Sequence, residues 1–392
     1  MIKTFIILIF MFSVSTAFSQ ISIDSVLVEI EKNNTSLAAY RKNADADKMG
    51  NKTNLLPDNP EVAFNYLWGS PDIIGNRTDL AITQSFDFPT AYLYRSQLAD
   101  MKNEQIEMEY KKRRFDVLLR AKVICYELIY LNALYSEYQK RLNNDLKIAN
   151  AFKKKMDAGE ATILEHNKAQ VSLLNTEKQL EQISIDRDAA LQQLASFNAG
   201  RKISFSGSDF GSNILEPDFE KWYAQAANNN SMLSWLKQEL AISSKEKQLQ
   251  VAQNLPKINA GYMSEKVVGE QFQGVTLGVS IPLWGNKHTI KHAKLKTEAV
   301  NSIEADAKVQ FYNEMKTLHD KATALQSSIT DFKQRISDNN ILELLEKAMQ
   351  QGEISLAEYY YELMVFYDNK EELLNMEKEL NVTLAKLYKY DL

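Results

Sequence analysis

The stretch from Asp79 to Gln97 reads DLAITQSFDFPTAYLYRSQ, and the stretch from Val275 to Ile290 reads VTLGVSIPLWGNKHTI. In both, polar and apolar residues alternate up to a proline, and a long pattern typical of a helix follows. Such alternation is typical of a strand with one polar and one apolar face. Pro89 and Pro282 therefore mark places where a strand ends and a helix begins.

The two stretches belong to an internal duplication. Pro282 and Gly352 each lie 193 residues after Pro89 and Gly159, respectively. The residues around the glycines also match, because MDAGEATILE at 156–165 resembles MQQGEISLAE at 349–358. The interpretation is a first repeat at residues 20–199, a Gly/Ser-rich connector at 200–216 and a second repeat at 217–392.

The fold class predicted from these patterns is mainly α with a small β part. Apolar residues recur every seven positions at Val117, Ile124, Leu131 and Tyr138, which is typical of coiled-coil packing. We expect long helical hairpins in each repeat, joined to a pair of strands. The predicted helices cover residues 23–56, 91–158, 162–197, 219–254, 287–351 and 355–388, and the predicted strands cover 61–68, 79–88, 257–264 and 273–283.

The amino terminus has the features of an export signal. Lys3 precedes an apolar run from Phe5 to Phe12, and a small-x-small cleavage site follows at 17–19, so residues 1–19 are predicted to be a signal peptide. The apolar run is shorter than the roughly 20 residues of a spanning helix. Cys125 is the only cysteine, which excludes an internal disulfide. A net charge of -5 argues against nucleic acid as a partner.

Four strands with one apolar face cannot close a membrane barrel alone, since the smallest barrels need about eight strands. Three copies of the chain would supply twelve. With QSFDFP at 84–89, SIPLWGNK at 280–287 and the glycine breaks, this order resembles the TolC-type outer-membrane efflux family. The resemblance implies a homotrimer in the cell outer membrane, with a 12-stranded β-barrel and an α-helical tunnel extending into the periplasm. It also implies a periplasmic adaptor and an inner-membrane pump as partners, with metal cations or drugs as cargo, no cofactor and no catalysis.

Under this interpretation one face of the strands contacts lipid, Pro89 and Pro282 mark the membrane boundary, and aromatic residues lie near the strand ends, where an aromatic belt is expected. The boundary aromatics are Trp68, Tyr92 and Trp284, with Tyr94 nearby. Thr276, Gly278 and Ser280 would face the lumen. The alternative is a soluble hairpin that packs its apolar residues on a helix. The lipid-facing residues would be Val62, Phe64, Leu80, Ile82, Val275, Leu277, Val279 and Ile281.

The glycine breaks would lie at the periplasmic mouth of the tunnel. There each carboxylate of a trimer forms a ring that favours cations and can act as a gate, with the lysines at 153–155 as pairing partners. The alternative is that acidic residues merely stabilise helix N-termini. The tip and gate candidates are Asp157, Gly159, Glu160, Glu165, Gly352, Glu353 and Glu358.

No catalytic motif is recognisable. His288 and His292 are four residues apart, a spacing that a transition metal can use, but no third ligand is evident and a solvated lysine-rich face is the favoured interpretation. The predicted function is a passive exit duct for solutes delivered by the pump. A secreted periplasmic coiled-coil scaffold without channel activity is the alternative.

Overall fold

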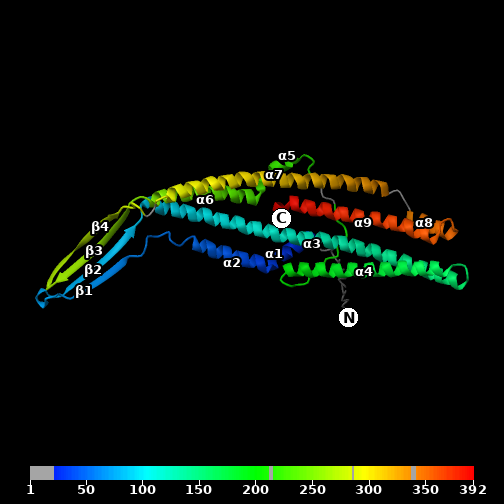
Figure 1. Ribbon diagram of the computed structural model, residues 1–392, viewed down its shortest axis with the longest axis horizontal. Coiled ribbons are helices and arrows are strands. Elements are labelled where there is room, and N and C mark those ends of the chain that lie inside the picture. Colours follow the sequence, from blue (N-terminus) through cyan, green and yellow to red (C-terminus); the bar gives the residue numbers. More distant parts are fainter. Residues whose placement is uncertain (1–21, 212–214, 285–286, 337–340) are drawn as a thin grey trace, which may run out of the picture.

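The computed structural model describes residues 22–211, 215–284, 287–336 and 341–392. It is elongated, with a sheet at one end and helices running from it to the opposite end, while the carboxyl terminus lies near the middle (Figure 1). The predicted signal peptide lies outside the described residues. No helix in the described ranges combines the length and hydropathy needed to cross a membrane.

The first half of the chain contains two short helices, two strands and two long helices. A 3-10 turn, η1 (Asp72–Ile74), lies between the strands. The elements are α1 (Ile23–Asn33), α2 (Thr35–Gly50), β1 (Glu61–Leu67), β2 (Arg77–Phe86), α3 (Pro89–Asp157) and α4 (Ile163–Phe197).

The second half follows the same order of elements. Its elements are α5 (Phe219–Asn229), α6 (Ser231–Gln253), β3 (Lys257–Val267), β4 (Glu270–Ser280), α7 (Thr289–Ile336), α8 (Ile341–Gln351) and α9 (Leu356–Leu387), followed by η2 (Lys389–Asp391). This mainly helical fold with a small antiparallel sheet confirms the predicted fold class. The exact limits of the two repeats and of the connector stay a prediction.

Helix α3 is the longest described element, with 69 residues. It begins at Pro89, where a proline has no amide hydrogen to lose and its fixed φ suits the first turn. It contains no further proline and no glycine, and at about 1.5 Å per residue it measures roughly 100 Å. The prediction of one long helix after the first strand pair is confirmed.

The corresponding prediction in the second half was wrong in its details. A single helix was expected over residues 287–351. The structure describes α7 and α8 on either side of residues 337–340, which lie outside the described part, so the continuity of this helix stays a prediction. Helix α7 begins only at Thr289, because His288 has a φ of +72°, which is not helical. Pro282 therefore lies seven residues before its helix, whereas Pro89 is the first residue of α3.

The predicted helices at 23–56 and 219–254 are each two helices, which corrects the sequence interpretation. The break falls at Asn34 in one and at Asn230 in the other, and both residues have extended backbone. The side-chain oxygen of Asn34 accepts a hydrogen bond from the Leu37 amide at 2.8 Å, and that of Asn230 accepts one from the Leu233 amide at 2.9 Å. Asparagine at an N-cap stabilises a new helix start, which competes with continuing the old helix.

Replacing Asn34 with alanine is expected to destabilise the fold by about 1–2 kcal/mol. Besides the cap, the side-chain amide of Asn34 donates to the Phe197 carbonyl at 2.8 Å, so alanine removes both the cap of α2 and a hydrogen bond to the end of α4. Asn34→Asp keeps the cap and loses only the second bond, so its loss should be smaller. Urea unfolding followed by far-UV circular dichroism measures both. Equal stability of Asn34→Ala and the native protein would contradict this assignment.

The four strands form one antiparallel sheet in the order β1-β2-β3-β4. All four predicted strands are present, but β3 extends to Val267 and β4 covers residues 270–280 instead of 273–283. Ile281 and Leu283 therefore follow the last strand. The sheet is flanked by two edge strands, β1 and β4, which belong to different halves of the chain.

The main core lies along the predicted coiled-coil seam of α3. Ala121 and Leu128 are fully buried, and Val117 and Ile124 pack against the same cluster. Leu194 of α4 joins this cluster, which also includes residues of α1. Cys125 is fully buried there as well, in agreement with its interpretation as a packing residue. The seven-residue pattern thus describes the packing of the helices correctly.

The connector is packed on the helices, which its composition did not indicate. Ile203 and Phe205 are buried in the core cluster of α3 and α4. The Asn132 amide donates to the Gly207 carbonyl at 2.8 Å, while Arg187 donates to the Asn132 side-chain oxygen at 2.6 Å. Arg187 lies seven residues after Leu180 and seven before Leu194, so it interrupts an apolar row of α4, and its hydrogen bond to Asn132 explains why a charged residue is tolerated there.

Candidate functional site: an apolar sheet face, a helical tip and a junction groove

The strand register places the predicted lipid-facing residues on one face of the sheet. Residues directly opposite each other in an antiparallel pair point to the same face. Ile82 lies opposite Val62 on one side and Tyr262 on the other, and Tyr262 lies opposite Val275. The apolar face comprises Val62, Phe64, Leu80, Ile82, Phe86, Ile258, Tyr262, Val275, Leu277 and Val279.

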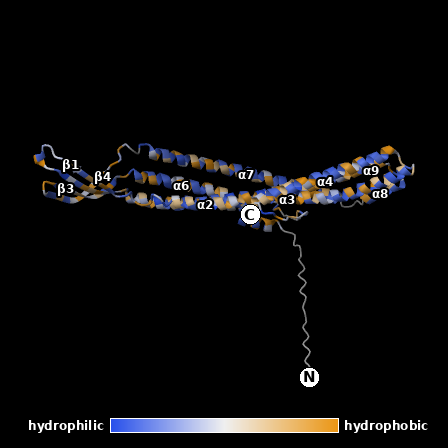
Figure 2. Cartoon of the chain, turned by 90° about the horizontal axis from the view of Figure 1, so that it is seen from below, coloured by the Kyte–Doolittle hydropathy of each residue, from blue (hydrophilic) through white to orange (hydrophobic). Residues whose placement is uncertain are grey.

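This apolar face is uncovered in the single chain. Val275 and Leu277 are 85% and 82% exposed, and Phe64 is 65% exposed. In Figure 2, apolar residues coloured orange recur along the strands as well as along the helices. Continuous apolar patches of this kind are rare on soluble monomers and mark interaction or membrane surfaces. Ile281, predicted with this set, is 63% exposed but follows the last paired residue of β4.

The opposite face of the sheet carries most of its polar and charged side chains, although Met263 and Phe272 also lie on it, and we call it the polar face. Asp79 lies directly opposite Glu265, and Arg77 contacts the carboxylates of both, at 2.8 Å and 3.2 Å. Thr276 and Gly278, predicted to face the lumen, lie on this polar face. The sequence did not identify the charged group, because Asp79 and Glu265 are brought together only by the pairing of strands from different halves of the chain.

Exposed tryptophans flank the sheet. Trp68 follows β1 and Trp284 follows β4, and each is 80% exposed. Strands of 11 residues are about 36 Å long, and a tilt of about 45° reduces this to about 25 Å, the height of an apolar membrane band. Tyr92, in the first turn of α3, accepts a hydrogen bond through its hydroxyl from the Asp87 backbone amide at 2.9 Å, and its place in an aromatic belt stays a prediction.

A charged cluster fastens the strands to α3. Lys257 at the start of β3 contacts the Asp87 carboxylate at 2.9 Å, and Arg95 of α3 contacts the other oxygen of the same carboxylate. The Arg95 guanidinium also lies 5.4 Å from the centre of the Tyr92 ring. These contacts hold β2, β3 and α3 together beside Pro89, where the strand gives way to the helix.

The end of the molecule opposite the sheet is formed by two helical turns, residues 157–165 and 350–358, which we call the tip. Gly159 and Gly352 both have a φ of +77°, a conformation that residues with a Cβ rarely adopt. Each helix that follows begins with a capping box, formed by Thr162 with Glu165 and by Ser355 with Glu358. The two turns are therefore alike in backbone and in hydrogen bonding, as their sequences predicted.

Two of the predicted gate carboxylates, those of Glu165 and Glu358, take part in the capping boxes. Glu165 accepts from the Thr162 amide at 2.7 Å and Glu358 from the Ser355 amide at 2.8 Å. These backbone hydrogen bonds, and those to the cap hydroxyls, lower the pKa of both carboxyl groups. Asp157, Glu160 and Glu353 are exposed at the tip.

The tip also carries apolar side chains that the sequence interpretation did not single out. Ile163 and Leu164, in the first turn of α4, are 66% and 69% exposed. In the matching turn of α9, Leu356 is buried. Of the lysines predicted as partners of the tip carboxylates, Lys155 lies with its ammonium group 5.5 Å from the centre of the Phe152 ring.

Between the tip and the middle of the molecule, charged contacts join α3 to α9. The guanidinium of Arg141, whose side chain is 7% exposed, pairs with Glu371 and lies between the rings of Tyr138 and Tyr367, 4.2 Å and 4.0 Å from their centres. Nearby, Lys370 contacts the buried Glu137 at 2.7 Å. These residues are more than 200 positions apart in sequence, and no local pattern connects them.

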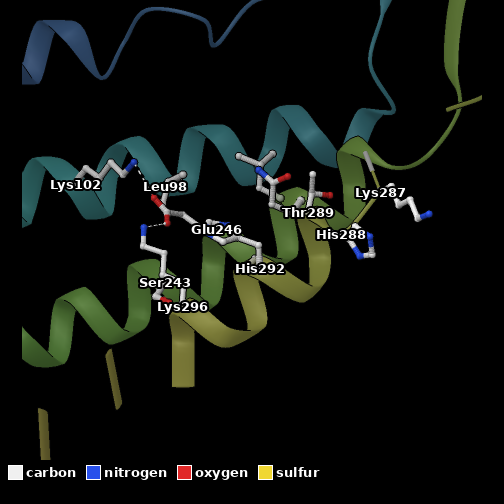
Figure 3. Close-up of a pocket in the computed structure, with 12 residues that line it drawn as sticks. Leu98, Lys102, Ser243, Glu246, Lys287, His288, Thr289, His292 and Lys296 are labelled. Carbon is white, nitrogen blue, oxygen red and sulfur yellow. Dashed lines mark hydrogen bonds and ion pairs between the residues drawn. The ribbon is translucent and has the colours of Figure 1, made fainter. Parts of the chain in front are cut away.

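Near the sheet, α3, α6 and the start of α7 enclose a groove of about 620 Å³, which we call the junction groove. Glu246 lies between Lys102 and Lys296, at 3.1 Å and 2.7 Å from their ammonium groups (Figure 3). Lys287, His288 and His292 line the same groove. The spacing of His288 and His292 suggested that both lie on one helical face. They do not, because His288 precedes α7. Within the described ranges, no group of three or more potential metal ligands is present.

The ion pairs of Glu246 predict acid sensitivity. Burial acts to raise the pKa of Glu246, but hydrogen bonds from Lys296 and Lys102 outweigh it and hold the pKa below its usual value. Because the folded-state pKa is lowered, this group stabilises the fold at a pH above about 4.5, and the contribution is lost as the pH falls through the folded-state value. Glu246→Gln should therefore lower stability at neutral pH and reduce its dependence on pH between about 3 and 5. Thermal unfolding across this range tests it, with Glu160→Gln at the tip as the control. A Glu246→Gln profile parallel to that of the native protein would contradict the assignment.

The fold of this chain is similar to that of solved structures, although no family model and no curated protein matches its sequence. Solved structures described as an outer membrane protein (VceC), as forming a transmembrane channel (CusC) and as an outer membrane channel (CmeC) do match in fold. VceC from Vibrio cholerae has a TM-score of 0.77 at 14% identity, over 94% of this chain and 95% of that chain. CusC gives 0.77 at 12% identity, over 94% and 91%, and CmeC from Campylobacter jejuni gives 0.71 at 14%, over 94% and 85%. The predicted resemblance to TolC-type channels is thus confirmed at the level of the fold.

Proposed function

We propose that this chain is one subunit of an outer-membrane exit duct. Three copies would close a 12-stranded barrel around a continuous lumen, and the long helices would continue this lumen as a tunnel into the periplasm. The observation that carries the proposal is the apolar sheet face, on which residues from all four strands lie in register and uncovered. In a membrane, lipid would cover this apolar face and keep it out of water, so no further protein layer is needed.

The sheet edges support oligomerisation. In lipid the unpaired amide and carbonyl groups of β1 and β4 would each lack a partner, at a cost of several kcal/mol per group. Pairing β1 of one copy with β4 of the next removes all edges. The polar face with Arg77, Asp79 and Glu265 would then line the lumen, where water and ion pairing stabilise the charges.

The tip suits the periplasmic mouth of such a duct. In a trimer the exposed carboxylates of Asp157, Glu160 and Glu353 would each form a ring of three, which favours cations and can restrict the opening. We assign gating to these three residues rather than to Glu165 and Glu358, which cap helices. The exposed Ile163 and Leu164 would contribute to docking of the adaptor, which joins the duct to an inner-membrane pump.

The duct would catalyse no reaction, because the pump supplies the energy and this chain supplies a wet path and a gate. Planar bilayer recordings of the purified oligomer test the proposal, with discrete conductance steps as the expected result. The same oligomer carrying Gly159→Pro, which disrupts the tip but not the sheet, should still insert. Failure of the native protein to insert would instead support the alternative, a secreted periplasmic scaffold.

A further inference from the structure

We propose that the junction groove is a binding site for a phosphate-bearing solute. The groove is lined by cationic side chains from two helices and the segment before α7: Lys102 and Lys296 lie beside Glu246 at one end, and Lys287 and His288 lie at the other, with the Lys287 side chain pointing away from Glu246 (Figure 3). Lys102, Lys287 and Lys296 line it together with His288 and His292, while Glu246 is the one carboxylate among its lining residues. The lining is therefore positively charged in excess, and a concave surface concentrates such a field.

Glu246 positions two of the lysines without using up their hydrogen-bonding capacity. Its two oxygens contact Lys102 at 3.1 Å and Lys296 at 2.7 Å, so that ammonium groups from α3 and α7 are held on both sides of α6 (Figure 3). Each ammonium has three donors and gives one to the carboxylate. The remaining donors are available to anion oxygens, for which charge-assisted hydrogen bonds are the strongest class.

The groove is large enough for more than inorganic phosphate. A volume of about 620 Å³ falls within the range of small-molecule sites, about 300–1,000 Å³. Its floor is partly apolar, because Leu98, Leu249 and Ala293 line it as well. A solute with a phosphate group and a small organic part would satisfy both the cations and the apolar floor.

The positions of residues around α3 indicate whether the groove lies on the same side as the polar face or the apolar face of the sheet. Arg95, Leu98 and Lys102 are three and four residues apart and so share one face of α3. Arg95 contacts Asp87 beside Lys257, and Lys257 lies on the polar face of the sheet because it pairs with Ser280. Leu93, on the opposite face of α3, is 54% exposed. The groove therefore lies on the same side of the chain as the polar sheet face. That this side faces the lumen rests on the proposed function.

Binding can be measured in the detergent-solubilised full-length protein by isothermal titration calorimetry with inorganic phosphate and with glycerol 3-phosphate. We expect saturable binding that weakens at least about tenfold in the triple variant Lys287→Gln, His288→Asn, His292→Gln. This variant leaves the ion pairs of Glu246 in place. The control Lys291→Gln, Lys294→Gln removes two cations from α7 that do not line the groove, and should bind as the native protein does.

Absence of saturable binding, or equal binding by the triple variant, would overturn the proposal. A second arm separates a solute from a lipid headgroup, by repeating the titration in phosphatidylcholine nanodiscs with and without phosphatidylglycerol. Equal binding in both supports the solute, whereas competition by phosphatidylglycerol would show that the groove faces the membrane and overturn the assignment. Because neither arm measures conduction, loss of channel activity and loss of binding remain distinguishable.

Discussion

Replacing Leu277 with arginine is expected to abolish assembly in the outer membrane. Leu277 lies within β4, two residues past its middle, on the apolar sheet face and is 82% exposed in the single chain. An arginine facing lipid near the membrane midplane costs about 2–4 kcal/mol in each subunit, and a trimer would bear it three times. Membrane fractionation and native electrophoresis measure the loss, as a decrease in oligomer in the outer-membrane fraction.

The matched control is Thr276→Arg, one residue away and on the polar face of the same strand. Its arginine would enter the aqueous lumen, so assembly should be retained. If Leu277→Arg and Thr276→Arg behave alike, the two faces of the sheet do not differ in environment, and the membrane interpretation fails. A secreted scaffold predicts this second outcome, since both positions would then be solvent-exposed.

Replacing Arg141 with alanine is expected to reduce the free energy of unfolding by about 3–5 kcal/mol. The alanine removes the ion pair with Glu371, whose carboxylate keeps, within the described part of the chain, only the hydrogen bond from the Tyr138 hydroxyl at 2.9 Å between α3 and α9. It also removes packing against Tyr138 and Tyr367, whose rings enclose the guanidinium. Guanidinium chloride unfolding followed by circular dichroism measures the change.

Two variants separate the causes. Arg141→Lys keeps the charge but loses the planar group that stacks between the rings, so an intermediate loss is expected. Arg113→Ala removes an exposed ion pair with Glu109 on the same helix and should cost less than about 1 kcal/mol. A loss for Arg141→Ala as small as that for Arg113→Ala would show that the contact between α3 and α9 contributes little to stability.

The local patterns of the sequence predicted the elements well. Alternation before Pro89 indicated a strand, and the absence of proline and glycine after it indicated the long α3, because these features act within a few residues of chain. The seven-residue row through Leu131 predicted the core for the same reason. The repeated glycines at 159 and 352 predicted two matching turns, and both have the same φ.

The features that escaped prediction depend on contacts or on competition between local preferences. Asn34 ends α1 by capping α2. The apolar pattern continues past Asn34 and therefore predicted one uninterrupted helix. The opposition of Asp79 and Glu265 requires the register of two strands from different halves of the chain. The position of Arg141 between two tyrosines requires the packing of α9 on α3. Such pairings arise from tertiary structure and leave no local signal.

Closure of the sheet between copies through β1 and β4 is the central feature of the proposed duct, and disulfide cross-linking tests it most directly. Each variant would carry two cysteines in one chain, one in β1 at Ala63 or Asn65 and one in β4 at Thr276 or Gly278, and all four combinations would be made. Cys125 is fully buried, and burial raises the pKa of its thiol to about 12, so it should not react, but it would be replaced with alanine. Closure predicts that at least one combination yields a covalent trimer in outer membranes after oxidation. Only monomers in every combination would contradict the trimeric barrel.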